Sequence, residues 1–420
     1  MAKIKKVLAR EILNSRGEPT VEAKVVLDDD YYGVSAAPSG VSISKYEAIE
    51  IHDNDVGRYL GLGVTQAVNS IGSIIGPKIK GVEASDQEQI DEILITLDGT
   101  DNKSKLGVNA ILPVSQAVLA AAAASAHFPI WYYINQKFFP DIKPHIPIPL
   151  FNIINGGKHG AGNLDFQEFL IVPASSRVFA DSLELGVEVY LSLKKTLATK
   201  QHIYSIGDEG GFAPNLYTNA AAFEILEEAI STTSFKIARD LFFGLDAAAS
   251  HFQHDSLYVI KDRASPLNTS EFIDYYRDLM KRFHLLVLED PLGEDDWDGW
   301  RSFTSQFGSQ VIIVGDDLLA TNSKRLETAI SKAAANAILV KANQIGTMTE
   351  TFKIIAQARR AGWKIIVSHR SGETNDTLVA DLAVATGAEY VKFGAPARGE
   401  RVAKYNRLSE IDLSLTGKPA

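Results

Sequence analysis

A lysine stands at the end of a short apolar run late in the chain, where burial could alter its chemistry. Residues 337–340 (AILV) form the run, Lys341 ends it, and a polar turn closed by Gly346 follows. Water is scarce at the end of a buried strand, so we expect the pKa of Lys341 to be lowered toward use as a base. A single lysine in this place more often just reaches solvent, so the neighbouring runs must decide between the two interpretations.

Carboxylates end the preceding runs in the same way. The first acid after each of three successive apolar runs is Asp246, Glu289 or Asp316. Strands of a β/α barrel converge at one mouth, so these acids would repel each other unless a divalent cation lay between them. Oxygen-only ligation without cysteine points to Mg²⁺ or Mn²⁺ rather than Zn²⁺. Each acid alone could instead cap a helix, but three in succession favour a shared site.

Basic side chains follow the last runs. His369 and Arg370 come after residues 365–367, and Lys392 ends the final run. Together with Lys341 they suit an anion, and their charge would keep Lys341 partly neutral through like-charge repulsion. A lysine base, a carboxylate-held metal and anion-binding groups predict abstraction of a proton next to a carboxylate. The metal would stabilise the doubly charged intermediate.

The overall charge limits the classes of partner. The 420 residues include 42 Lys and Arg against 52 Asp and Glu, a formal net charge of −10, and no cysteine. This balance argues against nucleic acid as the default partner and means that an anionic substrate needs a local positive site. The absence of cysteine excludes disulfides and thiolate chemistry and fits a reducing compartment. The N-terminal lysines precede no continuous apolar segment, so we predict no signal peptide.

The elements that must position these groups divide the chain into two parts. Residues 1–33 have the alternation of a β-meander, and residues 46–139 are mainly helical. Four prolines in residues 140–149 predict a domain boundary, because a helix cannot continue through them. We therefore expect an α+β N-terminal domain over residues 1–139 and a catalytic barrel domain over residues 140–420.

Two helices are predicted within the first part. Ser85 followed by Glu88 has the form of a capping box that opens a helix through Leu94. Residues 109–125 form the second. The most apolar stretch, residues 110–126, contains a proline and several polar side chains, which predicts a buried helix rather than a membrane span.

Apolar runs alternate with helical segments in the second part. The runs are residues 166–172, 241–245, 285–288, 311–314, 337–340, 364–367 and 390–392. Several are spaced by roughly a strand plus a helix, about 25–45 residues, which predicts a mainly parallel sheet in the α/β class. With this many units the sheet would close into a β/α barrel.

The sequence closely resembles the enolases nearly from end to end. The matching segments are AREILNSRGEPTVE (9–22), APSG (37–40), LDGTDNKSKLGVNAIL (97–112), NIINGGKH (152–159), DFQEF (165–169), GDEGGFAP (207–214), GLDAAAS (244–250), LEDPL (288–292), EDDWDGW (294–300), GDDL (315–318), VKANQIGT (340–347), VSHRSGET (367–374) and GAPARGER (394–401). The resemblance implies an α+β N-terminal domain and a β/α barrel, a TIM barrel whose first strands are irregular. It also implies reversible dehydration of 2-phosphoglycerate to phosphoenolpyruvate in glycolysis, by chemistry in which a lysine base works with Mg²⁺.

The resemblance also implies a role for each matched residue. Lys341 would take the C2 proton, and Glu209, with Glu168 beside it, would assist departure of the C3 hydroxyl. The first Mg²⁺ would be held by Asp246, Glu289 and Asp316, and a second by Ser39 when its loop closes. The remaining roles fall to His369 beside the catalytic groups and to the substrate contacts His159, Gln167, Arg370, Ser371 and Lys392.

Partners and location follow from the same resemblance. It implies two Mg²⁺ sites with Mn²⁺ as a substitute, a homodimer or homo-octamer, and a cytoplasmic location, with a surface or secreted pool by family analogy. We expect neither nucleic-acid binding nor a membrane span. Two alternatives remain, an enolase paralogue that acts on a related phosphonate or phosphate-bearing hydroxy acid, and a protein used mainly for binding as a surface receptor or scaffold.

Some positions depart from the family pattern, chiefly in the lid. The family's SGASTG is replaced here by residues 39–44 (SGVSIS), which places Ser44 where glycine is usual and puts easy hinging in doubt. Ile43 in this lid and Phe393 after Lys392 are expected close enough to the mouth to alter rate or substrate fit. Further departures are Glu18, Pro113 and Gly160.

Overall fold

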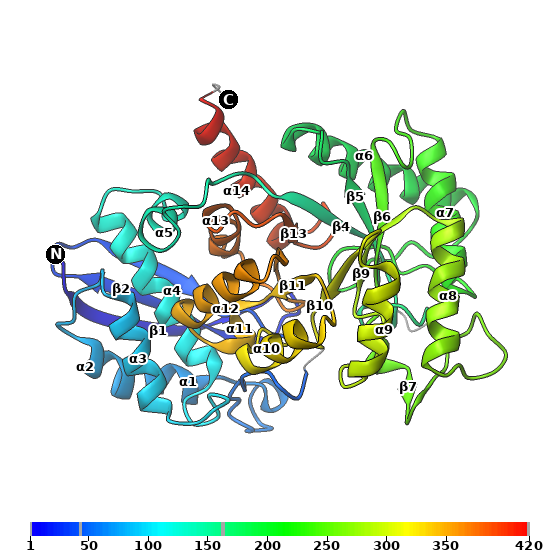
Figure 1. Cartoon of the computed structure of the whole chain (residues 1–420). Helices are drawn as coiled ribbons and strands as arrows, with labels where there is room; N and C mark the ends of the chain where they lie inside the picture. The colour runs from blue at the N-terminus through cyan, green and yellow to red at the C-terminus, as the bar shows by residue number, and fades with distance from the viewer. Residues whose placement is uncertain (1, 42–43, 161–163, 418–420) are drawn as a thin grey trace.

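The computed structural model describes residues 2–41, 44–160 and 164–417. A small N-terminal sheet with its helices lies at one side of the molecule, and the barrel lies at the other (Figure 1). The sheet is an antiparallel meander in the order β1-β2-β3. Its strands are β1 (Ile4–Leu13), β2 (Pro19–Leu27) and β3 (Tyr32–Ala36). The alternating pattern at the start of the chain therefore predicted the meander correctly.

Five α-helices and two short irregular turns of helix complete the described residues of this first part. They are η1 (Tyr59–Gly61), α1 (Thr65–Ser70), η2 (Ile71–Ile75), α2 (Gly76–Ile79), α3 (Gln87–Asp98), α4 (Val108–Ser125) and α5 (Ile130–Phe138). Residues 46–58 hold no helix, so the helical prediction over 46–139 was wrong at its start. The cap of α3 is Asp86, whose side chain accepts from the N–H of Gln89, and not Ser85. A carboxylate one residue later outcompetes the serine because Asp is an equally good cap that also suits the helix dipole.

The predicted helix at residues 109–125 is α4, and it packs under β2 and β3. Among the described residues it alone is long and apolar enough to cross a membrane, yet 83% of its apolar window is buried inside the protein. Pro113 lies inside this helix, in its second turn, where proline removes one backbone hydrogen bond without ending the helix. The helix is therefore a core element of this part of the fold.

The second part is a closed barrel of eight strands in the order β10-β11-β12-β13-β4-β5-β6-β9. Its strands are β4 (Ile148–Asn155), β5 (Glu168–Pro173), β6 (Leu241–Asp246), β9 (Leu285–Glu289), β10 (Ile312–Gly315), β11 (Ala337–Val340), β12 (Lys364–Ser368) and β13 (Tyr390–Lys392). Seven of them correspond to the predicted runs. The eighth, β4, begins inside the proline-rich segment, where prolines at the first positions of a strand are tolerated. The division at residues 139 and 140 stays a prediction.

Helices surround the barrel, and a two-stranded ribbon of β7 (Gln253–His254) and β8 (Leu257–Tyr258) interrupts one connection. The helices are η3 (Gly157–His159), α6 (Phe179–Thr199), α7 (Asn219–Ser231), η4 (Ala249–His251), α8 (Thr269–Arg282), α9 (Trp297–Phe307), α10 (Ser323–Lys332), α11 (Ala342–Ile345), α12 (Met348–Arg360), α13 (Leu378–Ala385) and α14 (Gly399–Thr416). The expected alternation holds from β6 onward. Before it, β4 is followed directly by β5, and two helices then precede β6.

One strand runs against the others, and this reversal matters for the site. β5 is antiparallel to both β4 and β6, whereas the remaining neighbours are parallel. Its first residue, Glu168, therefore pairs with Asn155 and Asp246, the last residues of its two neighbours. A side chain at the N-terminal end of β5 thus reaches the same mouth as the C-terminal ends of the parallel strands.

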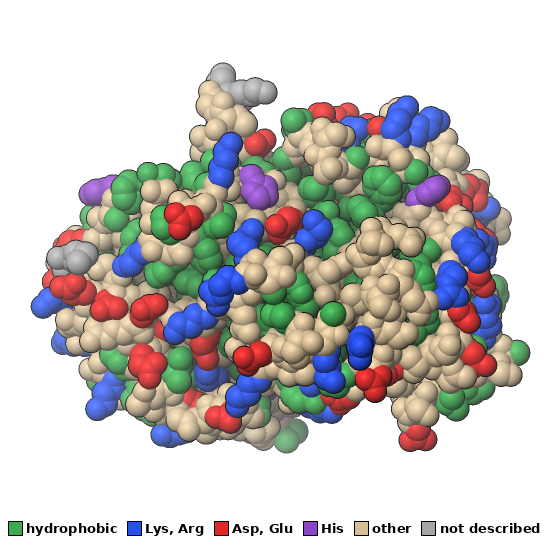
Figure 2. Space-filling view, in the orientation of Figure 1, with side chains coloured by type: hydrophobic (Ala, Val, Ile, Leu, Met, Phe, Trp, Pro, Cys, Tyr) green, Lys and Arg blue, Asp and Glu red, His purple; other side chains and the backbone are tan. Residues whose placement is uncertain are grey.

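The surface shows no single-sign field on the face drawn in Figure 2. Acidic and basic side chains are interspersed there, with small apolar areas between them. Interspersed charges favour solubility rather than the steering of a large polyanion.

Candidate active site

A small cavity lies at the mouth of the barrel, and most of the predicted site residues line it. Its volume is about 20 Å³, close to the space of one water molecule. The lining residues are His159, Gln167, Glu168, Glu209, Asp246, Asp316, Lys341, Ser368, His369, Arg370, Ser371 and Lys392. The structure thus brings together groups that lie up to about two hundred residues apart in the chain. Glu289 and Ser39 are the two predicted residues outside this lining.

Lys341 follows β11 as predicted, but its charge is not suppressed. Its ammonium donates to a carboxylate oxygen of Asp316. Burial acts to lower the pKa of Lys341, as do the charges of Arg370 and Lys392, yet Asp316 outweighs them and the pKa is raised. The expected lowering was therefore wrong for the protein without ligands, because the chain itself supplies a close counter-ion. The repulsion from the other two cations has the predicted direction.

Lys392 lies among three of the predicted acids. Its Nζ is 3.0 Å from Asp246 Oδ2, 2.8 Å from both carboxylate oxygens of Glu289, and 3.0 Å from Glu168 Oε2. All four side chains are buried. The strand-end argument predicted that Asp246 and Glu289 would share one position, and both contact Lys392. Asp316, the third acid of that argument, contacts Lys341 instead, and Glu168 at the start of β5 takes its place beside Lys392.

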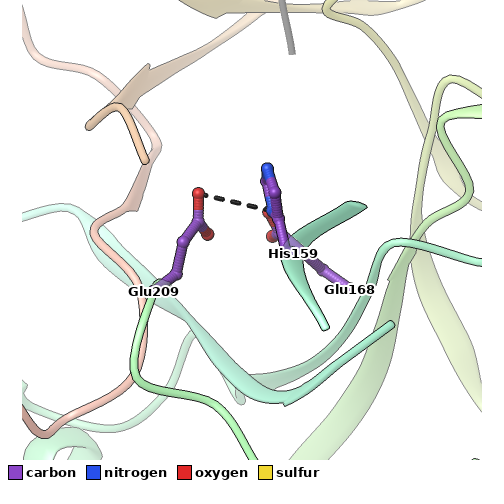
Figure 3. A group of neighbouring side chains, drawn as sticks. All are labelled: His159, Glu168 and Glu209. Carbon is purple, nitrogen blue, oxygen red and sulfur yellow. Dashed lines mark hydrogen bonds and ion pairs between the residues drawn. The ribbon is translucent and has the colours of Figure 1, made fainter. Parts of the chain in front are cut away.

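Glu168, His159 and Glu209 form a second buried group (Figure 3). His159 Nδ1 is 3.2 Å from Glu168 Oε1 and 3.5 Å from Glu209 Oε1. Burial and the neighbouring Glu209 raise the pKa of Glu168 to about 7. Burial opposes ionisation of Glu209 too, but His369 and His159 outweigh it and hold the pKa of Glu209 well below its usual range. The pKa values of the two carboxyl groups are thus shifted in opposite directions, which is a pattern of acid–base sites.

Further hydrogen bonds fix Glu209 in place. Asn152 Nδ2 donates to its Oε2 over 3.1 Å, and Ser371 Oγ donates to its Oε1 over 3.1 Å. His369 Nε2 lies 3.2 Å from Oε2. Burial lowers the pKa of His369 to about 4, so the imidazole is neutral at physiological pH.

Arg370, the predicted phosphate contact, is already paired. Its Nη1 donates to Glu47 Oε2 over 2.8 Å and to Asn343 Oδ1 over 2.9 Å. Its side chain also packs against the backbone of Gly40, where a Cβ would clash with the guanidinium. Glycine is therefore required at position 40 of the lid, because the guanidinium of Arg370 lies too close to the backbone for a side chain.

Ser39 lies beside the mouth rather than in the cavity. Its hydroxyl donates to Glu50, and its backbone pairs with Gly372 through N–O distances of 2.8 and 2.9 Å. A role in holding a metal would require the hydroxyl to leave Glu50. Ser42 and Ile43 of the lid lie outside the described residues, so the expected effect of Ile43 stays a prediction.

Phe393, the other residue near the mouth that differs from the family pattern, points away from the cavity. Phe393 is fully buried in the hydrophobic core, with its ring centroid 6.0 Å from that of Tyr405. It does not line the cavity. Because neighbouring residues of a strand point to opposite faces, Lys392 points inward and Phe393 outward. The position of Phe393 therefore does not support the expectation that it alters rate or substrate fit.

The carboxylates at the mouth fit a divalent cation. Burial and the charge of Asp246 raise the pKa of Glu289 well above its usual range. A second acidic group, Asp290, Asp316 and Asp317, has one oxygen from each within 4.8 Å of the others. Burial raises the pKa of Asp317 to about 7, with Asp316 adding to the effect. The mouth thus has more buried carboxylates than its lysines neutralise, and an all-oxygen donor set of this kind suits Mg²⁺.

Several residues at the site were not predicted. They are Glu47, Asn152, Asp290, Asp317, Asn343, Ser368 and Arg401. Most of them lie inside matched segments, but the strand-end rule selects only the first charged residue after each run. The partner of Arg370, Glu47, comes from a loop of the N-terminal part, in the stretch that was wrongly predicted as helix.

The fold and the site together define a class, the β/α-barrel enzymes that perform acid–base chemistry on a small anion at the carboxyl end of the barrel. Two family comparisons make the assignment particular. A family described as "Enolase, N-terminal domain" matches residues 4–134, and one described as "Enolase, C-terminal TIM barrel domain" matches residues 143–419. The chain belongs to the enolase family. It is a phosphopyruvate hydratase, a glycolytic lyase that interconverts 2-phosphoglycerate and phosphoenolpyruvate.

Proposed function

We propose that Lys341 takes the C2 proton of 2-phosphoglycerate and that Glu209 assists departure of the C3 hydroxyl. Lys341 lies at the end of β11, and Glu209 lies on the loop before α7, so both reach one cavity. The observation that carries the assignment is the opposed ionisation of Glu168 and Glu209 beside a lysine at the same mouth. A neutral carboxyl there can donate a proton to a leaving hydroxyl while an ionised one holds it by hydrogen bonding.

The family uses Mg²⁺, and we propose that Asp246, Glu289 and Asp316 hold one ion in this chain, with Ser39 serving a second and Mn²⁺ able to substitute. Bound there, the ion would supply positive charge for the negative charge that develops on the substrate carboxylate. Lys392 and Lys341, which now contact these acids, would then be released toward the substrate. This exchange of partners is what frees Lys341 from Asp316.

The remaining residues are proposed as substrate contacts. Arg370 and Ser371 would face the phosphate. To do so, Arg370 would have to break its ion pair with Glu47. Gln167, His159 and Lys392 complete the set, while His369 donates to Glu209. Arginine suits a phosphate because its fork can make two parallel hydrogen bonds.

A turnover assay tests these roles together. Purified protein with Mg²⁺ and 2-phosphoglycerate should show growing enol absorbance, which a chelator or Lys341→Ala abolishes. Mg²⁺-dependent turnover of an analogue, with none of 2-phosphoglycerate, would favour the paralogue. No turnover of either would leave a binding role.

For assembly and location we propose at least a homodimer in the cytoplasm, with an octamer as the larger alternative. The outer face of the N-terminal sheet supports an oligomer. Leu8, Tyr32 and Val34 are each more than a third exposed on it, and Leu8 and Val34 both lie beside Lys24 of β2. A groove of about 490 Å³ runs beside them. Exposed apolar side chains gathered on one sheet face are typical of a contact surface.

A further inference from the structure

A buried arginine next to the mouth has no part in the roles above. Arg401 lies in the first turn of α14 and is fully buried, one of the largest such side chains in the chain. A guanidinium in this position is costly unless its N–H groups and its charge are well compensated. Among the residues that the structure describes, the only carboxylate in ion-pair range is that of Glu400, 3.4 Å from Nε. The cost of burying the Arg401 guanidinium must therefore be offset by its other contacts.

Both terminal nitrogens of Arg401 are fully used. Nη1 donates to His369 Nδ1 over 2.6 Å and to the carbonyl oxygen of Arg370 over 2.5 Å. Nη2 donates to the carbonyl oxygens of Ser371 over 2.5 Å and of Asp208 over 3.2 Å. Four N–H groups thus meet four acceptors on two separate loops. The planar fork of arginine can do this, whereas the ammonium of lysine has three donors at a single point.

The contact with His369 decides where its proton lies. A guanidinium has no acceptor, so the bond from Arg401 requires Nδ1 of His369 to be unprotonated. The neutral ring must then carry its proton on Nε2, which lies 3.2 Å from Glu209 Oε2. The other tautomer would set an N–H against an N–H and two lone pairs against each other.

The backbone around Arg401 leaves room for this arrangement. A Cβ on Gly394, which has a φ of +85°, would lie 3.0 Å from the ring of His369 and 3.1 Å from Arg401 Cδ. The same Cβ would lie 2.7 Å from the carbonyl oxygen of Glu209. Glycine therefore lets the loop after β13 pass between the arginine, the imidazole and the Glu209 loop.

We propose that Arg401 is a positioning residue that locks His369 as the Nε2–H tautomer and ties the Glu209 loop to the Arg370–Ser371 loop. The catalytic consequence rests on the proposed roles of Glu209 and His369. The charged groups that face the pair are the carboxylates of Glu209, Glu373 and Glu400. With its tautomer fixed, His369 always presents a donor to Glu209 and never a lone pair.

Nitrogen NMR of the resting enzyme tests the tautomer without turnover. The Mg²⁺-loaded protein would be labelled with ¹⁵N-histidine, and the signal of His369 would be assigned by its loss in His369→Gln. The proposal expects a protonated Nε2 and an unprotonated Nδ1 in the wild type. In Arg401→Lys, which keeps the charge but not the fork, this pattern should be lost in favour of a tautomer mixture or a protonated ring. A protonated Nδ1 in the wild type, or an unchanged pattern in Arg401→Lys, would overturn the proposal.

Kinetics of the same variant test the consequence. We expect kcat of Arg401→Lys to fall roughly 10- to 100-fold, as for other residues that orient a catalytic group, with KM changing less. Arg407→Lys is the matched control, because Arg407 lies on the same helix and bonds Asp381 over 2.6 and 2.9 Å away from the cavity. It should leave kcat and the His369 signal unchanged. If Arg401→Lys does not fold, the wild-type tautomer still decides, and failure of Lys341 as base would leave that measurement intact.

Discussion

Each cation at the mouth already has a carboxylate partner within the chain. Lys392 contacts Asp246 and Glu289, and Lys341 contacts Asp316. Buried ion pairs of this kind are costly to break one-sidedly, because the group left behind stays charged and unpaired. With the proposed roles, substrate and metal would therefore bind by an exchange of partners, in which anionic groups of the substrate pair with the lysines and cations pair with the acids.

The neutral state of His369 leads to a prediction about its replacement. Its pKa of about 4 means that the ring is neutral throughout pH 6–8, with Nε2 3.2 Å from Glu209 Oε2. A glutamine amide can also donate to Glu209, whereas alanine cannot. We expect His369→Gln to stay within about tenfold of the wild-type kcat and His369→Ala to fall by about 10² or more, since a lost donor at a charged group has this order of effect. Steady-state kinetics should give the same ratio at pH 6 and pH 8, and equal losses in both variants would contradict the assignment.

At the scale of the elements, one buried carboxylate joins the two parts of the chain. Asp91 on α3 accepts from Ser115 Oγ of α4 over 2.6 Å and from the N–H of Thr349 on α12 over 2.8 Å. Because α12 follows the turn after Lys341, this contact helps to hold the base relative to the N-terminal part. Burial raises the pKa of Asp91 to about 6 despite these bonds.

This raised pKa predicts a pH dependence of stability. The folded protein binds the proton of Asp91 more tightly than the unfolded chain, whose reference value is 3.8. The contribution is therefore fully present below about pH 4 and is lost as the pH rises through about 6, by up to about 3 kcal/mol. Asp91→Asn should lack this loss. Between pH 4.5 and pH 7.5 the Tm of the wild type should therefore fall relative to the Tm of Asp91→Asn. Plots of Tm against pH that run parallel for the two proteins would contradict this prediction.

The strand-end rule found the barrel and most of the mouth because buried parallel strands leave a simple pattern. Seven strands, and the acids or lysines that end five of them, follow from apolar runs alone. Glu168 lies at the start of its strand, and only the reversal of β5 brings it to the mouth. The partner of Arg370, Glu47, and the tie made by Arg401 depend on tertiary contacts between loops that no local pattern encodes. The charge of Lys341 was misjudged for the same reason, since Asp316 becomes its neighbour only in the closed barrel.

At the scale of the whole molecule, the excess of acid is concentrated where a cation is expected. The net charge is −10, and the mouth gathers Asp246, Glu289, Asp290, Asp316 and Asp317 in buried positions. Their mutual repulsion opposes folding in the absence of a counter-charge. The binding of a divalent ion should therefore stabilise the whole chain.

Metal removal gives the corresponding prediction. Mg²⁺ at about 100 times its Kd should stabilise the folded state by about 2.7 kcal/mol and raise Tm by several degrees, and a chelator should reverse the rise. Glu289→Gln should lose most of the Mg²⁺-dependent rise. Scanning calorimetry with and without Mg²⁺ measures both. If Mg²⁺ raises the Tm of Glu289→Gln as much as that of the wild type, Glu289 is not a ligand of the ion.

The proposed oligomer is tested on the open sheet face. Leu8 and Val34 are each 41% exposed there. A glutamate at either position would bury a charge in a contact between copies, so Leu8→Glu and Val34→Glu should reduce the mass measured by light scattering. Val178, 63% exposed before α6, provides the control, since Val178→Glu should leave the mass unchanged. An unaltered mass in all three variants would place the contact elsewhere.

The central claim is that Lys341 removes the C2 proton in a step that Glu209 does not perform. Exchange of the C2 hydrogen of 2-phosphoglycerate with solvent deuterium, followed by NMR with Mg²⁺ present, isolates this step from loss of the hydroxyl. Glu209→Gln should still exchange the C2 hydrogen while forming almost no phosphoenolpyruvate, and Lys341→Ala should do neither. Exchange at the wild-type rate in Lys341→Ala would contradict the account.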